Sequence, residues 1–244
     1  MMTNVHRPIL EVCLSPALLH LYDTNGAVVV IIDIFRATST ITAALHNGAK
    51  CVIPVASVDE CIAIGKSIPG SITAGERDGK IAEGLQHGNS PLEYPEHFVK
   101  DKTLVLTTTN GTRLLHMVEG AADIVIGSFL NLEAVCSYLL SQDKKVILGC
   151  ASWKDRFNLE DTLFAGAVVN ELQHSFEVND DSARVARHLF RSVNNGSYID
   201  FLKDSSHYRR LSAFGLQKEM EYCVTPNQHP VVPVLKGREI VVKN

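Results

Sequence analysis

VVVIIDIFRATSTITAALHNG, residues 28–48, is the segment of this chain that says most about its fold class. Residues 28–34 form an apolar run that is rich in β-branched side chains and contains one charge, Asp33. Such a run is typical of a strand that is covered on both faces. Residues 37–47 are predicted to form a helix, because Thr and Ser lie near its start and Gly48 follows its end. A buried strand that leads into a helix indicates a parallel sheet covered by helices.

The same alternation of apolar runs and helical patterns continues along most of the chain. Further strands are predicted at residues 51–55, 71–74, 103–108, 123–127 and 145–150. Helices are predicted at residues 57–66, 131–141, 158–172 and 180–202. This order predicts an α/β fold with a largely parallel sheet, covered by helices on both faces in a three-layer arrangement.

The C-terminal part of the chain departs from this alternation. Residues 219–242 are predicted to add strands at an edge of the sheet, because Pro226, Pro230 and Pro233 interrupt them and each lacks a donor N–H. No internal repeat is visible, so the 244 residues are predicted to form a single domain. Residues 194–197, Asn-Asn-Gly-Ser, mark a candidate subdomain boundary.

Composition and charge exclude several classes of protein. Of the residues, 45% are hydrophobic and 20% are charged, which is too apolar for a disordered chain. The net charge is −4 and no block of Lys and Arg stands out, so nucleic acid is not expected as a partner. The longest apolar run, residues 27–32, is too short to cross a membrane, and the first residues lack a secretory signal. We expect a cytoplasmic protein, and formation of a homo-oligomer stays open.

The six cysteines do not form a recognisable metal or disulfide framework. They lie at positions 13, 51, 61, 136, 150 and 223, and no two of them make a C-x-x-C pair. Closely paired spacing is what a structural zinc site or a disulfide scaffold would need. Buried thiols in a reducing compartment are therefore expected.

Four arginines follow predicted strands, at the sheet edge where open α/β sheets bind ligands. They are Arg36, Arg77, Arg113 and Arg156. A guanidinium group matches phosphate, sulfonate and carboxylate oxygens with two donors. The turn Thr108-Thr109-Asn110-Gly111-Thr112 adds hydroxyl and backbone N–H donors at a helix start, and Ser128 follows another strand. The pattern predicts a small anionic substrate, and solvated surface charges are the alternative.

Carboxylates follow the same strands and need a separate explanation, because they would repel an anion. They are Asp33, Glu76, Glu160 and Asp161. A divalent cation resolves the conflict, since Mg²⁺ prefers carboxylate oxygens together with water and phosphate oxygens. Pairing with the neighbouring arginines is one alternative. For Glu160 and Asp161, a favourable interaction with a helix N-terminus is another.

Phosphatase signatures can be tested against these segments. A haloacid-dehalogenase phosphatase needs a second aspartate two residues after the first, and Phe35 occupies that position after Asp33. The C-x5-R spacing of cysteine phosphatases is present from Cys150 to Arg156, although the loop lacks glycines to wrap a phosphate. Cys150 is thus a candidate nucleophile, with a packing role as the alternative. His207 is a candidate proton donor, and an ordinary surface histidine is the alternative.

Five sets of segments at these strand ends form an ordered series of motifs: residues 32–40 (IDIFRATST), 75–77 with 88–91 (GER and GNSP), 107–113 (TTTNGTR), 127–131 (GSFLN) and 150–166. In these segments, and more weakly at residues 221–223 and 232–234, the chain resembles the 2-phosphosulfolactate phosphatase family. The resemblance implies a Mg²⁺-dependent hydrolase that converts (2R)-2-phospho-3-sulfolactate to 3-sulfolactate and phosphate, in coenzyme M biosynthesis. The chain departs from the family pattern at Asp155, where glycine is expected, and at Asn227, where aspartate is expected.

The strand-end pattern and the resemblance together predict a site with three kinds of residue. Asp33, Arg36, Cys150 and Arg156 are the predicted catalytic residues. Arg77, Thr108, Thr109, Asn110, Gly111, Thr112, Arg113 and Ser128 are predicted to bind substrate. Asp33, Glu76, Glu160 and Asp161 are predicted to hold Mg²⁺. Whether water, Asp33 or Cys150 attacks the phosphorus stays open. The alternatives are a phosphatase for another small phosphorylated acid and a non-catalytic protein that binds small anions.

Overall fold

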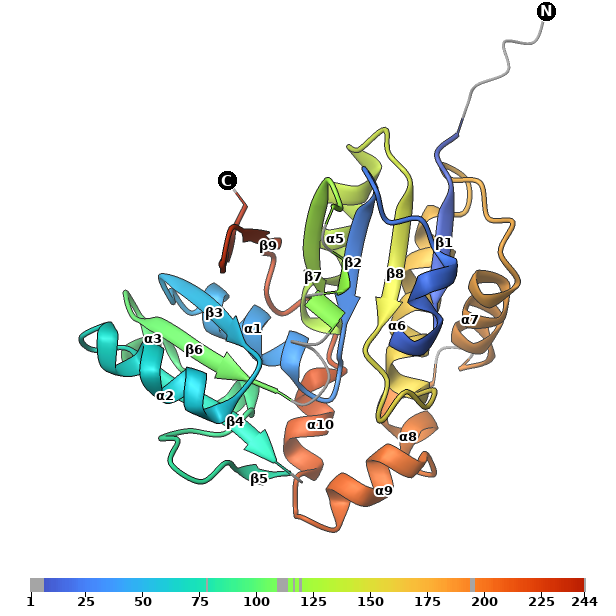
Figure 1. The fold of residues 1–244 in the computed structure, drawn as a ribbon. Helices are drawn as coiled ribbons and strands as arrows, with labels where there is room; N and C mark the ends of the chain where they lie inside the picture. The colour runs from blue at the N-terminus through green and yellow to red at the C-terminus, as the bar shows by residue number, and fades with distance from the viewer. Residues whose placement is uncertain are drawn as a thin grey trace, which may run out of the picture.

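The computed structural model describes residues 7–77, 79–108, 114–115, 117–118, 120–193 and 196–243. Its centre is a ten-stranded sheet, shown from the front in Figure 1. In sheet order the strands are β1 (Leu10–Cys13), β8 (Val146–Cys150), β2 (Val28–Ile32), β7 (Asp123–Gly127), β9 (Pro233–Lys236), β10 (Glu239–Val242), β3 (Cys51–Val55), β6 (Thr103–Thr107), β4 (Ile72–Arg77) and β5 (Lys80–Ile81).

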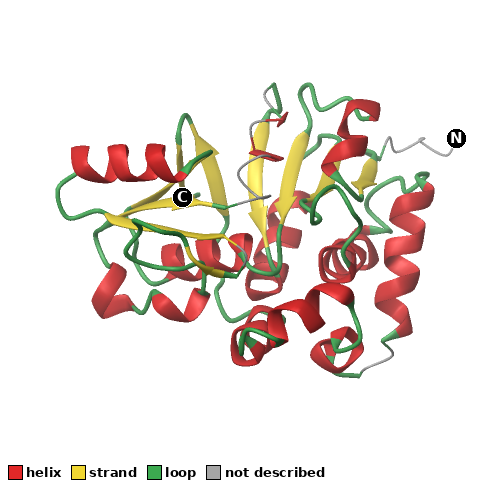
Figure 2. Cartoon of the chain, turned by 60° about the horizontal axis from the view of Figure 1, so that its bottom comes forward, coloured by secondary structure: helices red, strands yellow, loops and turns green. Residues whose placement is uncertain are grey.

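Helices lie on both sides of this sheet, as Figure 2 shows. The α-helices are α1 (Ala37–His46), α2 (Val58–Ser67), α3 (Glu96–Val99), α5 (Leu132–Leu140), α6 (Leu159–Leu172), α7 (Asp181–Ser192), α8 (Tyr198–Leu202), α9 (Ser206–Ser212) and α10 (Gln217–Cys223). The described residues also form the 3-10 helices η1 (Pro16–Leu21), η2 (Pro91–Glu93) and η3 (Phe129–Asn131). The predicted α/β class, with a largely parallel and helix-covered sheet, is confirmed.

Strand β2 shows why the apolar run at residues 28–32 needs cover on both faces. Val28, Val30 and Ile32 pack in one core with side chains of α5, α6 and α7. Val29 and Ile31 point to the opposite face and pack with side chains of α1 and η1. Because successive strand residues alternate between faces, a strand buried on both sides must be apolar throughout.

The sheet contains two groups of parallel strands, together with the antiparallel strands β9, β10 and β5. The first is β1-β8-β2-β7, in which β2 pairs with β7 and β8 over all five of its residues. The second is β3-β6-β4, whose outer face is covered by α2 through a small core that contains Cys61. In Figure 1, α8, α9 and α10 lie beyond the C-terminal ends of strands β8 and β4.

The C-terminal strands do not lie at the sheet edge, so this part of the prediction is wrong. The antiparallel β9–β10 hairpin lies between the two parallel groups and joins them. Each joint has a single register pair, Val125 with Val234 and Ile240 with Val52. Without the hairpin, β7 of the first group and β3 of the second would each have an unpaired edge. The hairpin pairs with both, β9 with β7 and β10 with β3. Pro233 is tolerated because it is the first residue of β9.

Two further differences concern helices. Residues 217–223, partly predicted as strand, form helix α10. The predicted helix at residues 180–202 is instead two helices, α7 and α8, and their connection includes residues 194–195, which lie outside the described part of the chain. The candidate boundary at residues 194–197 is therefore only partly described.

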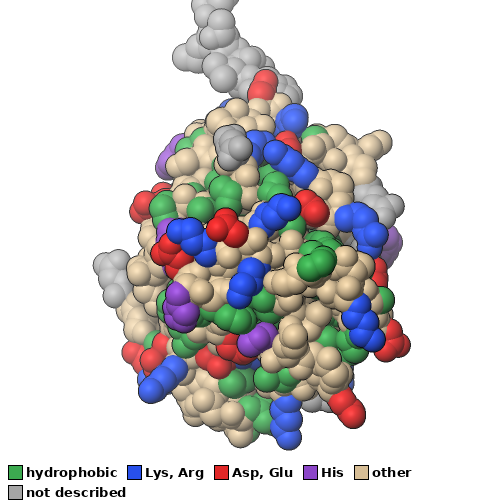
Figure 3. Space-filling model, turned by 90° about the vertical axis from the view of Figure 1, so that its left-hand side faces the viewer, with side chains coloured by type: hydrophobic (Ala, Val, Ile, Leu, Met, Phe, Trp, Pro, Cys, Tyr) green, Lys and Arg blue, Asp and Glu red, His purple; other side chains and the backbone are tan. Residues whose placement is uncertain are grey.

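Three features of the core and surface bear on the sequence predictions. All six cysteines are buried and free, as expected. Among the described residues, no helix combines the length and hydrophobicity that a membrane span requires. On the face drawn in Figure 3, basic and acidic side chains are interspersed over the described surface, so that neither sign dominates there.

Candidate active site

One pocket lies where strands of both parallel groups end. It is lined by Asp33, Phe35, Arg36, Glu76, Asn89, Thr108, Trp153, Lys154, His207, Arg210 and Leu211. Asp33 follows β2 in the first group, and Glu76 belongs to β4 in the second. The structure thus brings these two carboxylates, which are 43 positions apart in the chain, to the same pocket.

A larger cavity of about 1300 Å³ lies elsewhere, between the ends of α6, α7 and α10 and the start of α8. Among the described residues that line it, Glu221 is the only carboxylate and none is a predicted site residue. The pocket at the strand ends has a volume of only about 60 Å³ but holds carboxylates and cations together. We therefore take the smaller pocket as the candidate active site.

The loop after β2 fixes Asp33 at the start of α1. The Asp33 backbone N–H donates to Thr38 Oγ1 at 3.1 Å, and the Thr38 hydroxyl donates back to the Asp33 carbonyl at 2.9 Å. The Ala37 N–H points at Asp33 Oδ1 at 3.4 Å. A carboxylate at a helix N-terminus is stabilised by the helix dipole and by the unpaired N–H groups of the first turn. The side chain is 9% exposed.

The pKa of Asp33 is raised to about 6, mainly by burial, and the nearby carboxylates of Glu76 and Glu160 contribute to the rise. His207 and the Ala37 N–H act in the opposite direction and lower this pKa. The carboxylates of Asp33 and Glu76, which both line the pocket, repel each other when both are ionised. A bound cation would relieve that repulsion.

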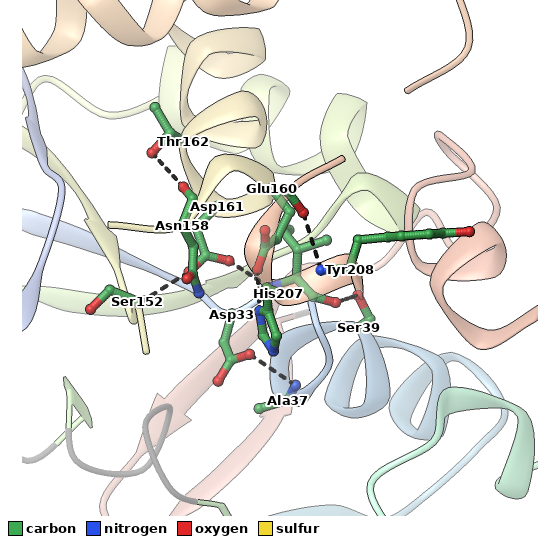
Figure 4. A network of polar contacts seen from close by, with 12 residues as sticks. Asp33, Ala37, Ser39, Ser152, Asn158, Glu160, Asp161, Thr162, His207 and Tyr208 are labelled. Carbon is green, nitrogen blue, oxygen red and sulfur yellow. Dashed lines mark hydrogen bonds and ion pairs between the residues drawn. The ribbon is translucent and has the colours of Figure 1, made fainter. Parts of the chain in front are cut away.

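His207 on α9 is held by a carboxylate from α6. Its Nδ1 lies 2.5 Å from Glu160 Oε1, and Figure 4 shows the pair beside Asp33. Glu160 is completely buried, and its other oxygen, Oε2, has no hydrogen-bond partner among the described residues. Glu160, predicted as a metal ligand, therefore contacts His207 and does not line the pocket. The contact orients the imidazole that does line it.

Asp161 connects two loops of the site. Its Oδ1 accepts a hydrogen bond from the Ile34 N–H at 2.9 Å, and its Oδ2 accepts one from the Ser152 N–H at 3.1 Å. The side chain is 1% exposed, and burial together with Glu160 and Asp33 raises its pKa well above the ordinary range. Because both oxygens are engaged with backbone donors, the geometry favours a positioning role for Asp161 over the predicted role of metal ligand.

The predicted arginines have different environments. Arg36 is 6% exposed, lines the pocket and forms an ion pair with Glu219 of α10. Arg77 is half-buried and turns away from the lining, donating to Thr107 Oγ1 at 3.2 Å and to the Glu76 carbonyl at 2.7 Å. Arg156 is exposed and does not line the pocket. Of these three, the structure brings only Arg36 to the pocket.

The predicted anion-binding turn is only partly described. Thr108 lines the pocket. Thr109, Asn110, Gly111, Thr112 and Arg113 lie outside the described residues, so their predicted roles stay predictions. Ser128 is completely buried, with Oγ within hydrogen-bonding distance of Asn131 Oδ1 and Thr42 Oγ1, and it does not line the pocket.

Comparisons with known proteins are consistent with this geometry. The model of the 2-phosphosulpholactate phosphatase family matches residues 13–238, which include every described residue of the pocket. The chain belongs to this family. Similar proteins named probable 2-phosphosulfolactate phosphatase occur in Thermotoga petrophila (44% identity; 88% of this chain and 91% of the relative) and Caldanaerobacter subterraneus (41%; 86% and 88%). Another, from Clostridium perfringens, is 34% identical over 95% of both chains.

Membership in the 2-phosphosulfolactate phosphatase family makes the chain a phosphoric monoester hydrolase. The structure does not bring the C-x5-R pair of Cys150 and Arg156 to the pocket. Cys150 is 1% exposed, and burial raises the pKa of its thiol well above the ordinary value, with the Asp161 carboxylate adding to the effect. Since the thiolate is the nucleophilic form, this environment does not favour attack by Cys150.

The pocket residues of this phosphatase fit a hard divalent cation. Asp33 and Glu76 supply carboxylate oxygens, and Asn89, 4% exposed, supplies an amide oxygen that has no hydrogen-bond partner among the described residues. The described residues contain no cluster of three His, Cys, Asp or Glu side chains arranged around a metal position. Mg²⁺ does not need one, because it commonly binds one or two carboxylates and completes its shell with water and substrate oxygens.

Six residues that line the pocket were not assigned a site role from the sequence. They are Phe35, Asn89, Trp153, Lys154, Arg210 and Leu211. Asn89 belongs to the GNSP turn that carried part of the family resemblance, so a signal was present. Arg210 lies one turn after His207 on α9, in a region without a strand-end pattern, and nothing in the sequence linked it to the sheet.

Proposed function

We propose that this protein is a Mg²⁺-dependent phosphatase that hydrolyses (2R)-2-phospho-3-sulfolactate to 3-sulfolactate and phosphate, and that it belongs to coenzyme M biosynthesis. The observation that carries the proposal is the meeting of Asp33 and Glu76 with Arg36 in one pocket. The names of the relatives support the substrate, since each is called a probable 2-phosphosulfolactate phosphatase.

In this proposal the acidic side chains hold the cation and the basic ones hold the substrate. Asp33, Glu76 and the amide oxygen of Asn89 would be the protein ligands. A bound Mg²⁺ neutralises phosphoryl oxygens and stabilises the charge that develops during phosphoryl transfer. Arg36, fixed by its ion pair with Glu219, presents a cation to the same phosphoryl group.

His207 is the proposed general acid. With Nδ1 bound to Glu160, Nε2 is the ring nitrogen that remains for the substrate. The leaving group is the oxygen of a secondary alcohol, which is a strong base and needs a proton as the P–O bond breaks. His207 Nε2–H would donate that proton, and Glu160 would stabilise the imidazolium before transfer and hold the ring in place.

The test is phosphate release by the purified protein with Mg²⁺ and with EDTA. Turnover of 2-phospho-3-sulfolactate with Mg²⁺, its loss in EDTA, and a loss of at least 100-fold in Asp33→Asn are expected. Asp59→Asn, which changes an exposed carboxylate on α2, is the matched control and should keep full activity. Absence of turnover by the unaltered protein, or equal activity in EDTA, would overturn the proposal.

The alternative of a non-catalytic anion-binding protein rests on Asp155, the position where glycine is expected. Asp155 has a φ of 60°, a backbone conformation that glycine adopts freely. Its carbonyl accepts a hydrogen bond from Ser15 Oγ at 2.9 Å, which holds the loop in this conformation with aspartate present. The substitution therefore gives no reason to expect a changed loop. A phosphatase for another small phosphorylated acid is the alternative that the substrate panel below tests.

A further inference from the structure

One wall of the pocket carries a group of side chains that the proposed chemistry does not use. Trp153 and Lys154 come from the loop after β8, and Arg210 comes from α9. The guanidinium carbon of Arg210 lies 4.3 Å from the centre of the Trp153 ring, and Lys154 Nζ lies 4.7 Å from the same ring. Both cations are thus stacked against one indole, which is the aromatic ring that attracts cations most strongly.

The Trp153 loop has a defined and strained conformation. The Trp153 N–H donates to the Arg156 carbonyl and the Arg156 N–H donates to the Trp153 carbonyl, both at 3.0 Å. Between them, Lys154 and Asp155 have φ angles of 52° and 60°, the pattern of a two-residue hairpin turn of type I′. Non-glycine residues in this conformation cost stability and tend to occur at functional sites.

The loop is also tied to the proposed metal ligands. Asp161 accepts from Ser152 on this loop with one oxygen and from Ile34, next to Asp33, with the other. Arg210 lies three positions after His207 on α9, and residues three apart lie on the same face of a helix. The loop and α9 thus place Lys154 and Arg210 in the same pocket as Asp33 and His207.

We propose that Trp153, Lys154 and Arg210 form the binding site for the second acid group of the substrate, a sulfonate or carboxylate, and so select phosphate esters that carry one. The inference rests on the proposed function. Arg36 and the cation would face the phosphoryl group, whereas Lys154 and Arg210 lie together on Trp153, so these further cations fit an additional anion. Stacking on Trp153 orders the guanidinium before binding, which lowers the entropy lost when it grips an oxyanion.

Trp153 acts as a positioning residue in this proposal, and Arg210 and Lys154 determine specificity. The readout is the ratio of kcat/KM for 2-phospho-3-sulfolactate to kcat/KM for 2-propyl phosphate, which lacks a second acid group. Arg210→Gln is expected to lower this ratio by about tenfold or more through KM, and Lys154→Gln by several-fold. Trp153→Leu should lower the ratio, and Trp153→Phe should restore most of it. Arg184→Gln, an exposed arginine on α7, is the control and should leave the ratio unchanged.

A comparison of 2-phospho-3-sulfolactate with 2-phospholactate separates sulfonate from carboxylate. If Arg210→Gln lowers kcat/KM equally for both esters, relative to 2-propyl phosphate, Trp153, Lys154 and Arg210 bind the carboxylate that the two esters share. If the loss is larger for the sulfonated ester, these residues bind the sulfonate. An unchanged ratio in the Arg210 and Lys154 variants overturns the inference. If no ester is hydrolysed, calorimetric measurement of 3-sulfolactate binding gives an independent test. Weaker binding to Arg210→Gln than to the unaltered protein supports the inference that Arg210 binds an acid group. Equal binding to both, or no binding to the unaltered protein, overturns it.

Discussion

His207 Nδ1 and Glu160 Oε1 lie 2.5 Å apart, although the two residues are 47 positions apart in the chain and belong to different helices. Glu160 is completely buried, and His207 is the side chain that contacts its Oε1. The pair gives the pocket an oriented imidazole beside Asp33 and Glu76. If His207 donates a proton to the leaving group, the effect of replacing it should depend on how basic that leaving group is.

Replacement of His207 by Gln should slow hydrolysis of 2-phospho-3-sulfolactate by about 100-fold, within the range for loss of a general acid. Hydrolysis of 4-nitrophenyl phosphate should fall by less than about fivefold, because nitrophenolate leaves without a proton. Glu160→Gln, which keeps the size of the side chain, should show the same substrate dependence with a smaller loss. Equal losses on both esters, measured as kcat, would contradict general-acid catalysis by His207.

Asp33 should make the metal-free protein less stable as the pH rises. Its folded-state pKa of about 6 lies above the ordinary value of 3.8, mainly because burial penalises the charge. The folded state therefore holds the proton more tightly than the unfolded state, and stability is lost between about pH 4 and pH 6. In EDTA at pH 7, Asp33→Asn should be more stable than the unaltered protein by about 3 kcal/mol. Urea unfolding at pH 7 and at pH 4 should show this difference at pH 7 and little at pH 4; a destabilised variant at pH 7 would contradict it.

Asp155→Gly should stabilise the protein by about 0.5–1 kcal/mol, because glycine adopts a φ of 60° without strain. Asn227→Gly is the matched comparison. Asn227 has a φ of 59°, but its Oδ1 accepts a hydrogen bond from the Glu133 N–H at 2.9 Å, which glycine cannot make. Thermal unfolding should therefore show a higher Tm for the first variant and an unchanged or lower Tm for the second. A lower Tm for Asp155→Gly would show that its side-chain interactions outweigh the strain.

Cys150 should react slowly with iodoacetamide at pH 7, because its thiol is buried and its pKa is raised. Mass spectrometry of the folded protein should show far less alkylation at this position than in urea. Rapid alkylation that 3-sulfolactate prevents would instead indicate a thiolate in the pocket, as the C-x5-R spacing suggested.

The sequence predicted those parts of the fold that depend on local pattern. The apolar run at residues 28–32 could only be buried on both faces, and the structure confirms this. The β9–β10 hairpin was assigned to an edge because its prolines argue against a central strand. Its actual place depends on two open strands, β7 and β3, that are remote from it in the chain. A local sequence pattern cannot show which distant strands have an unpaired edge.

The same distinction applies to the pocket. Asp33, Arg36, Glu76 and Thr108 were found because each follows or ends a strand, and strand ends meet at one edge. Arg156 also follows a strand, but it is exposed to solvent. It comes after a tight turn in which Lys154 and Asp155 have positive φ angles, and the identities of these two residues do not predict such angles. His207 and Arg210 reach the pocket on a short helix that crosses the sheet edge, and only the tertiary structure reveals that crossing.

The most direct test of the proposed site is the position of the metal ion. Crystals grown with Mn²⁺ in place of Mg²⁺ and with 3-sulfolactate allow the ion to be located by its anomalous scattering. The account predicts a single strong peak bonded to carboxylate oxygens of both Asp33 and Glu76, with the organic acid beside Arg210. A peak bonded to Glu160 and Asp161 but to neither Asp33 nor Glu76 would contradict it.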